Sequence, residues 1–409
     1  MDLHFTVLQW GARLHYATPA ALEQAGMLRA VYTDATDGVL EGWTGKVAEY
    51  ILGSRANRLK ARSIPDVIPS DKVHSYPRYN AQEEVVNLLR NDHRAEINDR
   101  FRIGSHGLGR KVVRDEFAEG NAFYVHACNG TEAIREAKKN GLFVVLEAVS
   151  MPYHKYIEKE EYERHGLSHP DPEEEIESNI DFFRSEALMA DLVIAASTHV
   201  EEGLHRLGVP TSNTAVVPYG IEENFYDKPS TPEPGRVLFV GHVNYLKGVP
   251  YLAQAANILE ERGVECEVRI VGGYDEKVIE RPEFDGPKYV GLLSRDDVRE
   301  DFLKADVFVF PTLSDGFGIV LAEAAAAGLP IISTGNCGDV VAHEENGYIV
   351  PSRDPKTLAE RIQHIVQDRA LRSRMGMSSL NRFRKIFTLD QYAQNIKQVI
   401  QDRYNNWIN

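Results

Sequence analysis

The segment Asp306–Pro330, DVFVFPTLSDGFGIVLAEAAAAGLP, decides the fold class of this chain. Its first part, residues 306–312, is a short apolar and β-branched run, which predicts a buried strand leading into a loop. Residues 319–327 are rich in helix-forming residues and are followed by a glycine and then a proline, which are typical helix stop signals. The pattern therefore predicts a strand, a tight glycine loop and a helix.

The loop before that helix is expected to bind an anion. The first N–H groups of a helix lack partners within the helix, and the helix start carries about half a positive charge. Gly316, Phe317 and Gly318 can present backbone donors at this place. Phosphate is the anion that such a loop most often binds.

Two acidic residues, eight positions apart, flank the loop. Glu323 lies one helical turn after Ile319 and Val320, so its carboxylate shares their face and could accept hydrogen bonds from vicinal hydroxyls. Asp315 lies where a group attached to the phosphate would lie. One acid could therefore hold a ribose and the other a sugar. Alternatively, Glu323 only interacts with the helix dipole, worth about 0.3–1 kcal/mol, and Asp315 is a turn residue.

A second loop, FVGHVNYLKG (residues 239–248), also lies between a predicted strand and a helix expected to begin near Gly248 or Pro250. The Lys247 ammonium could reach diphosphate oxygens, and His242 could donate to the same group. The helix dipole disfavours a lysine at a helix start, which favours a binding role. Neither loop matches the dinucleotide or P-loop fingerprint, which disfavours a nicotinamide oxidoreductase and P-loop phosphoryl transfer.

Apolar strand-like runs alternate with helical patterns along almost the whole chain of 409 residues. Because these runs are continuous rather than alternating, they predict parallel sheets covered by helices on both faces. The proline-containing segment 216–235 is a predicted linker between two Rossmann-like domains. Ligands of such sheets bind at the carboxyl ends of the strands, so two facing sheets would form one cleft.

The composition is that of a globular protein, with 43% hydrophobic and 26% charged residues. The net charge of −15 disfavours a nucleic-acid binder. Three distant cysteines predict reduced thiols. With no long apolar run and no signal-peptide pattern, the expected location is cytoplasmic.

Two segments have an uneven charge. Residues 42–63 mix apolar and basic residues, which predicts either peripheral contact with an anionic membrane or a core-facing helix with a solvated basic face. The acidic segment 158–177 is expected to be a solvated helix and loop. Its His165 and His169 lie four positions apart, but the Gly, Ser and Pro around them break any helix, so we predict no metal site.

With these motifs in place, the chain resembles a retaining glycosyltransferase of family 4. The resemblance rests on VVPYGIEENF, FVGHVNYLKG, EVRIVGG, YVGLLSRDDVREDFLKADVFVFPTLSDGFGIVLAEAAAAGLPIISTG and NGYIVP, which lie within residues 216–352. It implies an α/β protein of the GT-B fold, with two Rossmann-like domains whose parallel sheets face each other across a cleft. The implied domains are residues 1–217 for the acceptor and 218–387 for the nucleotide-sugar donor, with a helix over 388–409 that packs back on the first.

The resemblance also implies roles for single residues. The two acids of the family motif map onto Asp315 at the donor sugar and Glu323 at the ribose, and Lys247 would neutralise the diphosphate. The full donor-binding set comprises Gly241, His242, Gly272, Gly291, Leu292, Gly316, Phe317, Gly318, Ile319 and Val320. The chain departs from the family twice, because the first acid is usually Glu and His242 stands where the family commonly has Arg.

The first half resembles the family only loosely. The loop after the first strand corresponds to the family's acceptor loop, and the residues expected to face the acceptor are Gly11, Arg13, His15 and Tyr16. Thr18 and Pro19 are expected to begin the following helix. A cleft histidine of the family has two candidate counterparts, His126 and His154, and either could instead be structural.

The implied activity is transfer of a sugar from a nucleoside diphosphate sugar to an acceptor hydroxyl, with retention at the anomeric carbon. UDP and GDP donors are favoured over ADP, no metal or other cofactor is expected, and the setting is glycan, glycolipid or polysaccharide biosynthesis. Two alternatives stay open. One is a sugar-nucleotide epimerase, and the other is a nucleotide-binding protein of this fold without turnover.

Overall fold

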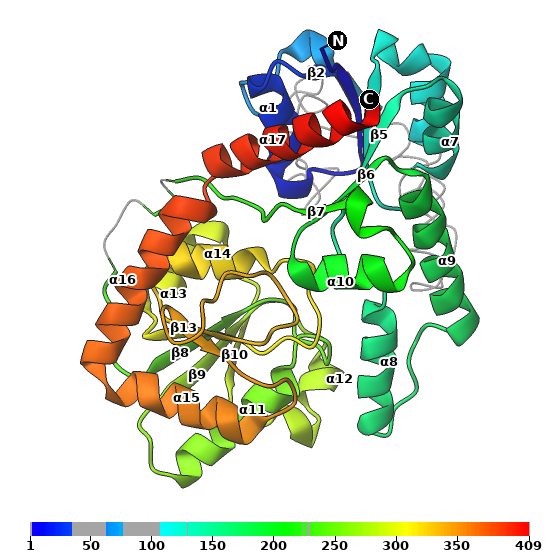
Figure 1. Cartoon of the computed structure of the whole chain (residues 1–409). Helices are drawn as coiled ribbons and strands as arrows, with labels where there is room; N and C mark the ends of the chain where they lie inside the picture. The colour runs from blue at the N-terminus through cyan, green and yellow to red at the C-terminus, as the bar shows by residue number, and fades with distance from the viewer. Residues whose placement is uncertain are drawn as a thin grey trace, which may run out of the picture.

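The computed structural model describes residues 2–34, 63–76, 107–128, 130–223, 225–226 and 230–408. Within these ranges the chain forms two parallel sheets with helices around them, one in the upper and one in the lower part of Figure 1. The basic segment 42–63 lies outside the described residues except for its last residue, so its membrane contact stays a prediction.

The first sheet comes from the chain before the linker. Its described strands are all parallel and stand in the order β3-β2-β1-β4-β5-β6-β7. They are β1 Phe5–Gln9, β2 Leu28–Thr33, β3 Val73–Ser75, β4 Ala122–His126, β5 Phe143–Ala148, β6 Leu192–Ala195 and β7 Thr214–Val216. Every residue of β1, β4, β5 and β6 is buried, because helices cover both faces of a parallel sheet.

The second sheet has the order β10-β9-β8-β11-β12-β13, and its strands are also all parallel. They are β8 Arg236–Val240, β9 Glu267–Val271, β10 Lys288–Gly291, β11 Val307–Phe310, β12 Ile331–Ser333 and β13 Gly347–Ile349. The central strand β11 is fully buried. The predicted fold class, two parallel α/β sheets, is confirmed.

Helices pack around both sheets. In the first half they are α1 Ala17–Gln24, α7 Thr131–Lys139, α8 His154–Arg164, α9 Glu173–Met189 and α10 Thr198–Arg206. In the second half they are α11 Val249–Glu261, α12 Glu276–Ile279, α13 Arg295–Lys304, α14 Ile319–Ala326, α15 Pro355–Gln367, α16 Arg369–Ile386 and α17 Leu389–Ile408. Short 3-10 turns are η1 Arg13–Tyr16, η2 Ser70–Lys72, η3 Glu116–Glu119, η4 Thr211–Asn213 and η5 Pro282–Phe284.

The helix α1 differs from its prediction at its start. It begins at Ala17, after a left-handed Tyr16, and no side chain caps it. The hydroxyl of Thr18, expected as the cap, instead lies 2.7 Å from the hydroxyl of Tyr392 on α17 and donates to Glu147 on β5. A tertiary contact thus replaces the local one.

The chain crosses between the two halves twice, and the two crossings lie side by side. The N–H of Ile221 donates to the carbonyl of Phe387 at 2.9 Å, and the N–H of Leu389 donates to the carbonyl of Ile221 at 3.0 Å. A side chain at Gly220 would place its Cβ 2.3 Å from the carbonyl oxygen of Thr388. Beyond this crossing, α17 runs along the first half beside α1 (Figure 1). The division into 1–217, 218–387 and 388–409 stays a prediction.

The acidic segment 158–177 is not wholly solvated, so that prediction is wrong for α8. This helix descends from the first half and ends beside the second half (Figure 1). The side chain of Glu161 is 0% exposed, and its carboxylate pairs with Arg353 of the second half at 2.7 Å. The local pattern of charges could not reveal a partner that lies 192 residues away.

None of the helices in the described ranges combines the length and the hydropathy that crossing a membrane would require.

Candidate active site

Three glycines lie at the carboxyl ends of β8, β9 and β10. The N–H of Gly241 donates to the carbonyl of Val271, and the N–H of Gly272 donates to that of Gly291, both at 2.9 Å. Gly272 has a φ of +146°, and a Cβ there would lie 1.9 Å from the carbonyl oxygen of Gly241. Only glycine fits at this position. The edge of the second sheet therefore presents backbone rather than side chains.

Two side chains flank this glycine edge. A Cβ at Gly273 would lie 3.5 Å from Nδ1 of His242 and 3.5 Å from a methyl carbon of Leu292. His242 is exposed, and Leu292 is 82% exposed, which is unusual for a large apolar side chain beside a sheet edge. These two groups are thus available to a ligand that lies over the glycines.

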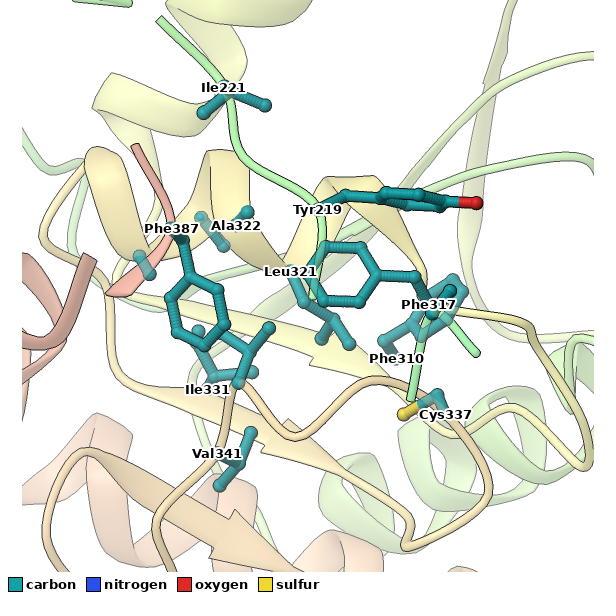
Figure 2. Packing of buried hydrophobic residues seen from close by; sticks show 14 of the residues in the cluster. Tyr219, Ile221, Phe310, Phe317, Leu321, Ala322, Ile331, Cys337, Val341 and Phe387 are labelled. Carbon is teal, nitrogen blue, oxygen red and sulfur yellow. The ribbon is translucent and has the colours of Figure 1, made fainter. Parts of the chain in front are cut away.

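The loop from β11 to α14 is anchored by one aromatic side chain. Phe317 is 2% exposed, and its ring centroid lies 5.4 Å from that of Tyr219 and 6.0 Å from that of Phe387. Figure 2 shows these rings around Leu321 and Phe310. The Phe317 ring thus fixes the loop to the core, and Asp315, Ile319 and Val320 on either side of the buried residues 316–318 are partly exposed.

Asp315 and Lys247 form an ion pair at the centre of the site. The Lys247 Nζ lies 2.5 Å from Oδ2 of Asp315, and both side chains are partly exposed. The other carboxylate oxygen accepts from the N–H groups of Phe317 at 3.2 Å and Gly318 at 2.9 Å. The two loops that the sequence singled out therefore meet, although 68 positions separate the two residues.

This arrangement changes which backbone N–H groups are available to an anion. The amides of Phe317 and Gly318 are taken by Asp315, whereas those of Ile319 and Val320 have no hydrogen-bond partner in the described part of the chain. Gly318 precedes α14 with a left-handed φ of +70°, so the helix start opens directly beside the ion pair. An ammonium has three N–H donors, so Lys247 can hold Asp315 and still donate to an anion.

Glu323 lies on the partly exposed face of α14, together with Ile319 and Val320, as predicted. Burial raises the pKa of its carboxyl above the ordinary value, and the nearby Arg295 and Arg299 act in the opposite direction. Among the described residues, no hydrogen bond to this carboxylate is formed. The group is thus largely removed from water and keeps its acceptor capacity for a ligand.

The two candidate histidines lie in different surroundings. His126 is 1% exposed, with its Nε2 3.5 Å from Glu147, and burial lowers its pKa. His154 begins α8, and its Nδ1 lies 2.8 Å from the carbonyl oxygen of Met151. Burial also lowers the pKa of His154, and the Lys247 cation lowers it further. His154 is therefore partly exposed at the start of α8, whereas His126 is enclosed.

The predicted acceptor residues follow β1. The N–H of Gly11 donates to Asp34 at 2.8 Å, and Arg13 to Tyr16 form the 3-10 turn η1. His15 is exposed and Arg13 is partly exposed. Tyr16 is 0% exposed, so it does not face a cleft as expected. Its left-handed backbone turns the ring inward, where the hydroxyl lies 3.2 Å from that of Thr33.

The sequence reading missed the residues that join the first half to the donor loop. Ser197 donates to the carbonyl of Gly316 at 2.6 Å, and Nε2 of His199 lies 3.0 Å from the Ser314 hydroxyl. Thr198 donates to Asp339 at 2.8 Å. A Cβ at Gly316 would lie 1.8 Å from the carbonyl oxygen of Val149. Each contact joins residues more than 100 positions apart, and no local signal marks them.

No cluster of His, Cys, Asp or Glu suited to a metal ion occurs among the residues that the structure describes.

The second half of the chain is similar to a known protein family. Residues 220–382 match the family model described as glycosyl transferases group 1. The match contains Lys247, Asp315 and Glu323. The resemblance to family 4 is thereby confirmed.

Curated relatives match over part of their length. The capsular polysaccharide biosynthesis glycosyltransferase CapM of Staphylococcus aureus is 29% identical over 42% of this chain and 46% of its own. The amylovoran biosynthesis glycosyltransferase AmsK of Erwinia amylovora is 26% identical over 44% of this chain and 48% of its own. The chain thus spans about half the length of these relatives.

Solved structures match over nearly the whole chain. Sucrose-phosphate synthase from Thermosynechococcus elongatus has a TM-score of 0.67 at 16% identity, covering 99% of this chain and 100% of its own. Anabaena HepE, solved in complex with UDP and glucose, has a TM-score of 0.62 at 15% identity, covering 98% of this chain and 100% of its own. The fold is GT-B.

Proposed function

We propose that this protein transfers a sugar from a nucleoside diphosphate sugar to an acceptor hydroxyl, with retention at the anomeric carbon. One observation carries the proposal. Lys247 pairs with Asp315, and Asp315 also accepts from the Gly318 amide directly before α14. The amides of Ile319 and Val320 have no partner among the described residues, and Glu323 follows on the same face of α14. A cation and a helix start suit a diphosphate, and a largely desolvated carboxylate suits the two hydroxyls of a ribose.

The mechanism is one of positioning and charge stabilisation. As the bond between sugar and diphosphate breaks, negative charge grows on the leaving oxygen, and Lys247 with the α14 amides stabilises it. In the proposed reaction that oxygen takes the proton of the attacking hydroxyl on the same face of the sugar. No residue then has to act as a nucleophile, and a preorganised site supplies the rate by orientation.

Asp315 has two proposed tasks. Its bonds to Lys247 and to the amides of Phe317 and Gly318 hold the loop in shape before the donor binds. Its remaining lone pairs could accept from a hydroxyl of the donor sugar. Since Asp is one methylene shorter than the Glu usual in family 4, the sugar would lie closer to the loop than in most relatives.

UDP is the first nucleotide to test, with GDP second and ADP third. HepE of the same fold was solved with UDP-glucose. The names of CapM and AmsK support a polysaccharide as the product class. The acceptor would bind at the edge of the first sheet, with Arg13, His15 and His154 as its proposed neighbours. A cytoplasmic location stays a prediction.

The test is a thermal-shift screen with UDP, GDP and ADP sugars, followed by product analysis. We expect a UDP or GDP sugar to raise the melting temperature, and the shift to shrink in Glu323→Gln and Lys247→Ala. NMR of the product should show the anomeric configuration of the donor. Absence of any shift would contradict the proposal. Conversion of the donor to an epimer without an acceptor would indicate an epimerase, and binding without turnover would indicate a nucleotide-binding protein.

A further inference from the structure

The end of α8 is held by the second half through a buried carboxylate. The side chain of Glu161 is 0% exposed, and it accepts hydrogen bonds from Nε of Arg353, at 2.7 Å, and from the hydroxyl of Tyr251. Burying a carboxylate is costly unless it is paired and hydrogen-bonded. Both donors come from the other half of the chain, so this burial depends on the way the two halves pack.

One helical turn later, His165 lies between two carboxylates. Its Nε2 is 3.4 Å from Glu161, and its Nδ1 is 3.7 Å from Glu283 of the second half. Arg281 pairs with Glu283 at 2.7 Å and points towards the carbonyl oxygen of His165 at 3.5 Å. The His165 side chain therefore contacts acidic groups from both halves.

These groups surround Tyr245, which belongs to the Lys247 loop. Tyr245 is 2% exposed, and its hydroxyl donates to Glu283 at 2.7 Å. Its ring centroid lies 5.1 Å from that of Tyr162 and 4.8 Å from that of His165, both supplied by the end of α8. Lys247 follows two residues later in the chain.

We propose that this contact, which we name the α8 contact and define by Glu161, Tyr162 and His165 against Tyr245 and Arg353, positions Lys247 for the donor diphosphate. Glu161 and His165 act as positioning residues, because they hold the helix that packs on Tyr245 and touch no reacting atom. The inference rests on the proposed function of Lys247. A displacement of about 1 Å at such a group lowers turnover strongly, since orientation supplies much of the rate.

Glu161 and its neighbour Glu160 provide a matched pair for the test. Glu160 also contacts Arg353, at 3.2 Å, but its side chain is 63% exposed. Glu161→Gln keeps the shape and removes the buried charge. We expect kcat to fall about tenfold in Glu161→Gln with a change of less than about threefold in the KM for the donor, and both constants to stay within about twofold in Glu160→Gln.

Amide hydrogen exchange tests the same contact without relying on activity. In the full-length protein, residues 241–248 should exchange at least about fivefold faster in Glu161→Gln than in the wild type or in Glu160→Gln. If Glu161→Gln does not fold, Tyr251→Phe removes only one donor to Glu161 and should show a smaller change in the same direction. The inference would be overturned if residues 241–248 exchanged at the wild-type rate in Glu161→Gln and in Tyr251→Phe, or in Tyr251→Phe alone when Glu161→Gln does not fold.

Lys247→Ala separates this inference from the proposed function. Wild-type turnover in Lys247→Ala would overturn the role of Lys247 and the catalytic part of the inference with it. A large loss in Lys247→Ala beside unchanged kcat and exchange in Glu161→Gln would overturn the inference alone. A loss in both, with Glu160→Gln unaffected, would support it.

Discussion

The carboxyl edges of the two sheets differ in what they leave for a ligand. At the second sheet, glycines lie at the ends of β8, β9 and β10, and Lys247, the amides of Ile319 and Val320 and the Glu323 carboxylate keep capacity for an outside partner. At the first sheet, the polar side chains around Glu147 pair with one another. Glu147 accepts from the hydroxyls of Tyr124 at 2.5 Å, Tyr219 at 2.7 Å and Thr18 at 3.2 Å.

This difference indicates that the carboxyl edges of the two sheets have different functions. The cluster around Glu147 joins β5 to the linker through Tyr219 and, by way of Thr18, to Tyr392 on α17. Burial raises the pKa of Tyr219 well above its ordinary value, and the Glu147 carboxylate raises it further, so the hydroxyl stays a donor. We infer that this cluster fixes the crossing between the halves, whereas the second edge binds the charged ligand.

The largest expected effect is that of Lys247→Ala, which removes the cation from the second edge. We expect kcat to fall by about 10²- to 10³-fold, the range found when a single preorganised donor to a growing charge is removed. The melting temperature should change little, because Lys247 and Asp315 are partly exposed. Turnover of a UDP sugar and thermal unfolding measure the two effects. Wild-type turnover would remove Lys247 from the site.

Gly316→Ala tests whether the two edges must touch. The new Cβ would meet the carbonyl oxygen of Val149, so the halves have to move apart, and we expect kcat/KM to fall about 30- to 100-fold. Gly335→Ala is the matched control, because nothing lies within 4 Å of a Cβ there. Equal kinetics in the two variants would mean that the contact at Gly316 has no role in turnover.

Glu147→Gln should weaken the hydrogen-bonded cluster at the edge of the first sheet and leave ligand binding at the edge of the second sheet unchanged. It replaces a buried carboxylate that accepts three hydroxyl donors, and we expect a loss of about 2 kcal/mol in the free energy of unfolding. The affinity for the free nucleotide should change less than about twofold. Denaturant unfolding and calorimetry with UDP measure these quantities. A large loss of nucleotide affinity at unchanged stability would reverse the roles given to the two edges.

Glu323→Gln is the opposite case and has the smallest expected effect. Nucleotide affinity should fall about tenfold, while stability at a pH above the raised pKa of Glu323 should rise slightly. The sign follows from the raised pKa of Glu323. Ionising this acid in the folded protein costs stability, and the loss develops as pH rises from the pKa of the unfolded state, 4.5, through the higher pKa of the folded state. Glutamine avoids that cost.

The same shift predicts a pH dependence of binding. In the wild type, nucleotide affinity should weaken as pH falls through the raised pKa of Glu323, because a protonated carboxyl accepts fewer hydrogen bonds. This loss of affinity at low pH should be absent from Glu323→Gln. Calorimetry between pH 5 and pH 8 measures it, and an identical profile in both proteins would remove Glu323 from the nucleotide site.

Much of the fold was predictable because its signals are local. The strand, glycine loop and helix predicted over residues 306–327 are present as β11, the loop and α14. Runs of apolar residues also marked the other long strands. The edge strands β3, β7 and β13 have three residues each, which are too few to show a pattern in the sequence.

The candidate site was likewise predictable only in part. The sequence determined which residue types stand at the loop and helix start, since a lysine after one strand and two acids around the next follow directly from the chain. Only the tertiary structure decided that Asp315 pairs with Lys247 and takes two amides, that Tyr16 turns inward and that α8 reaches the Lys247 loop. Local signals act over a few residues, whereas these contacts depend on how two sheets pack against each other.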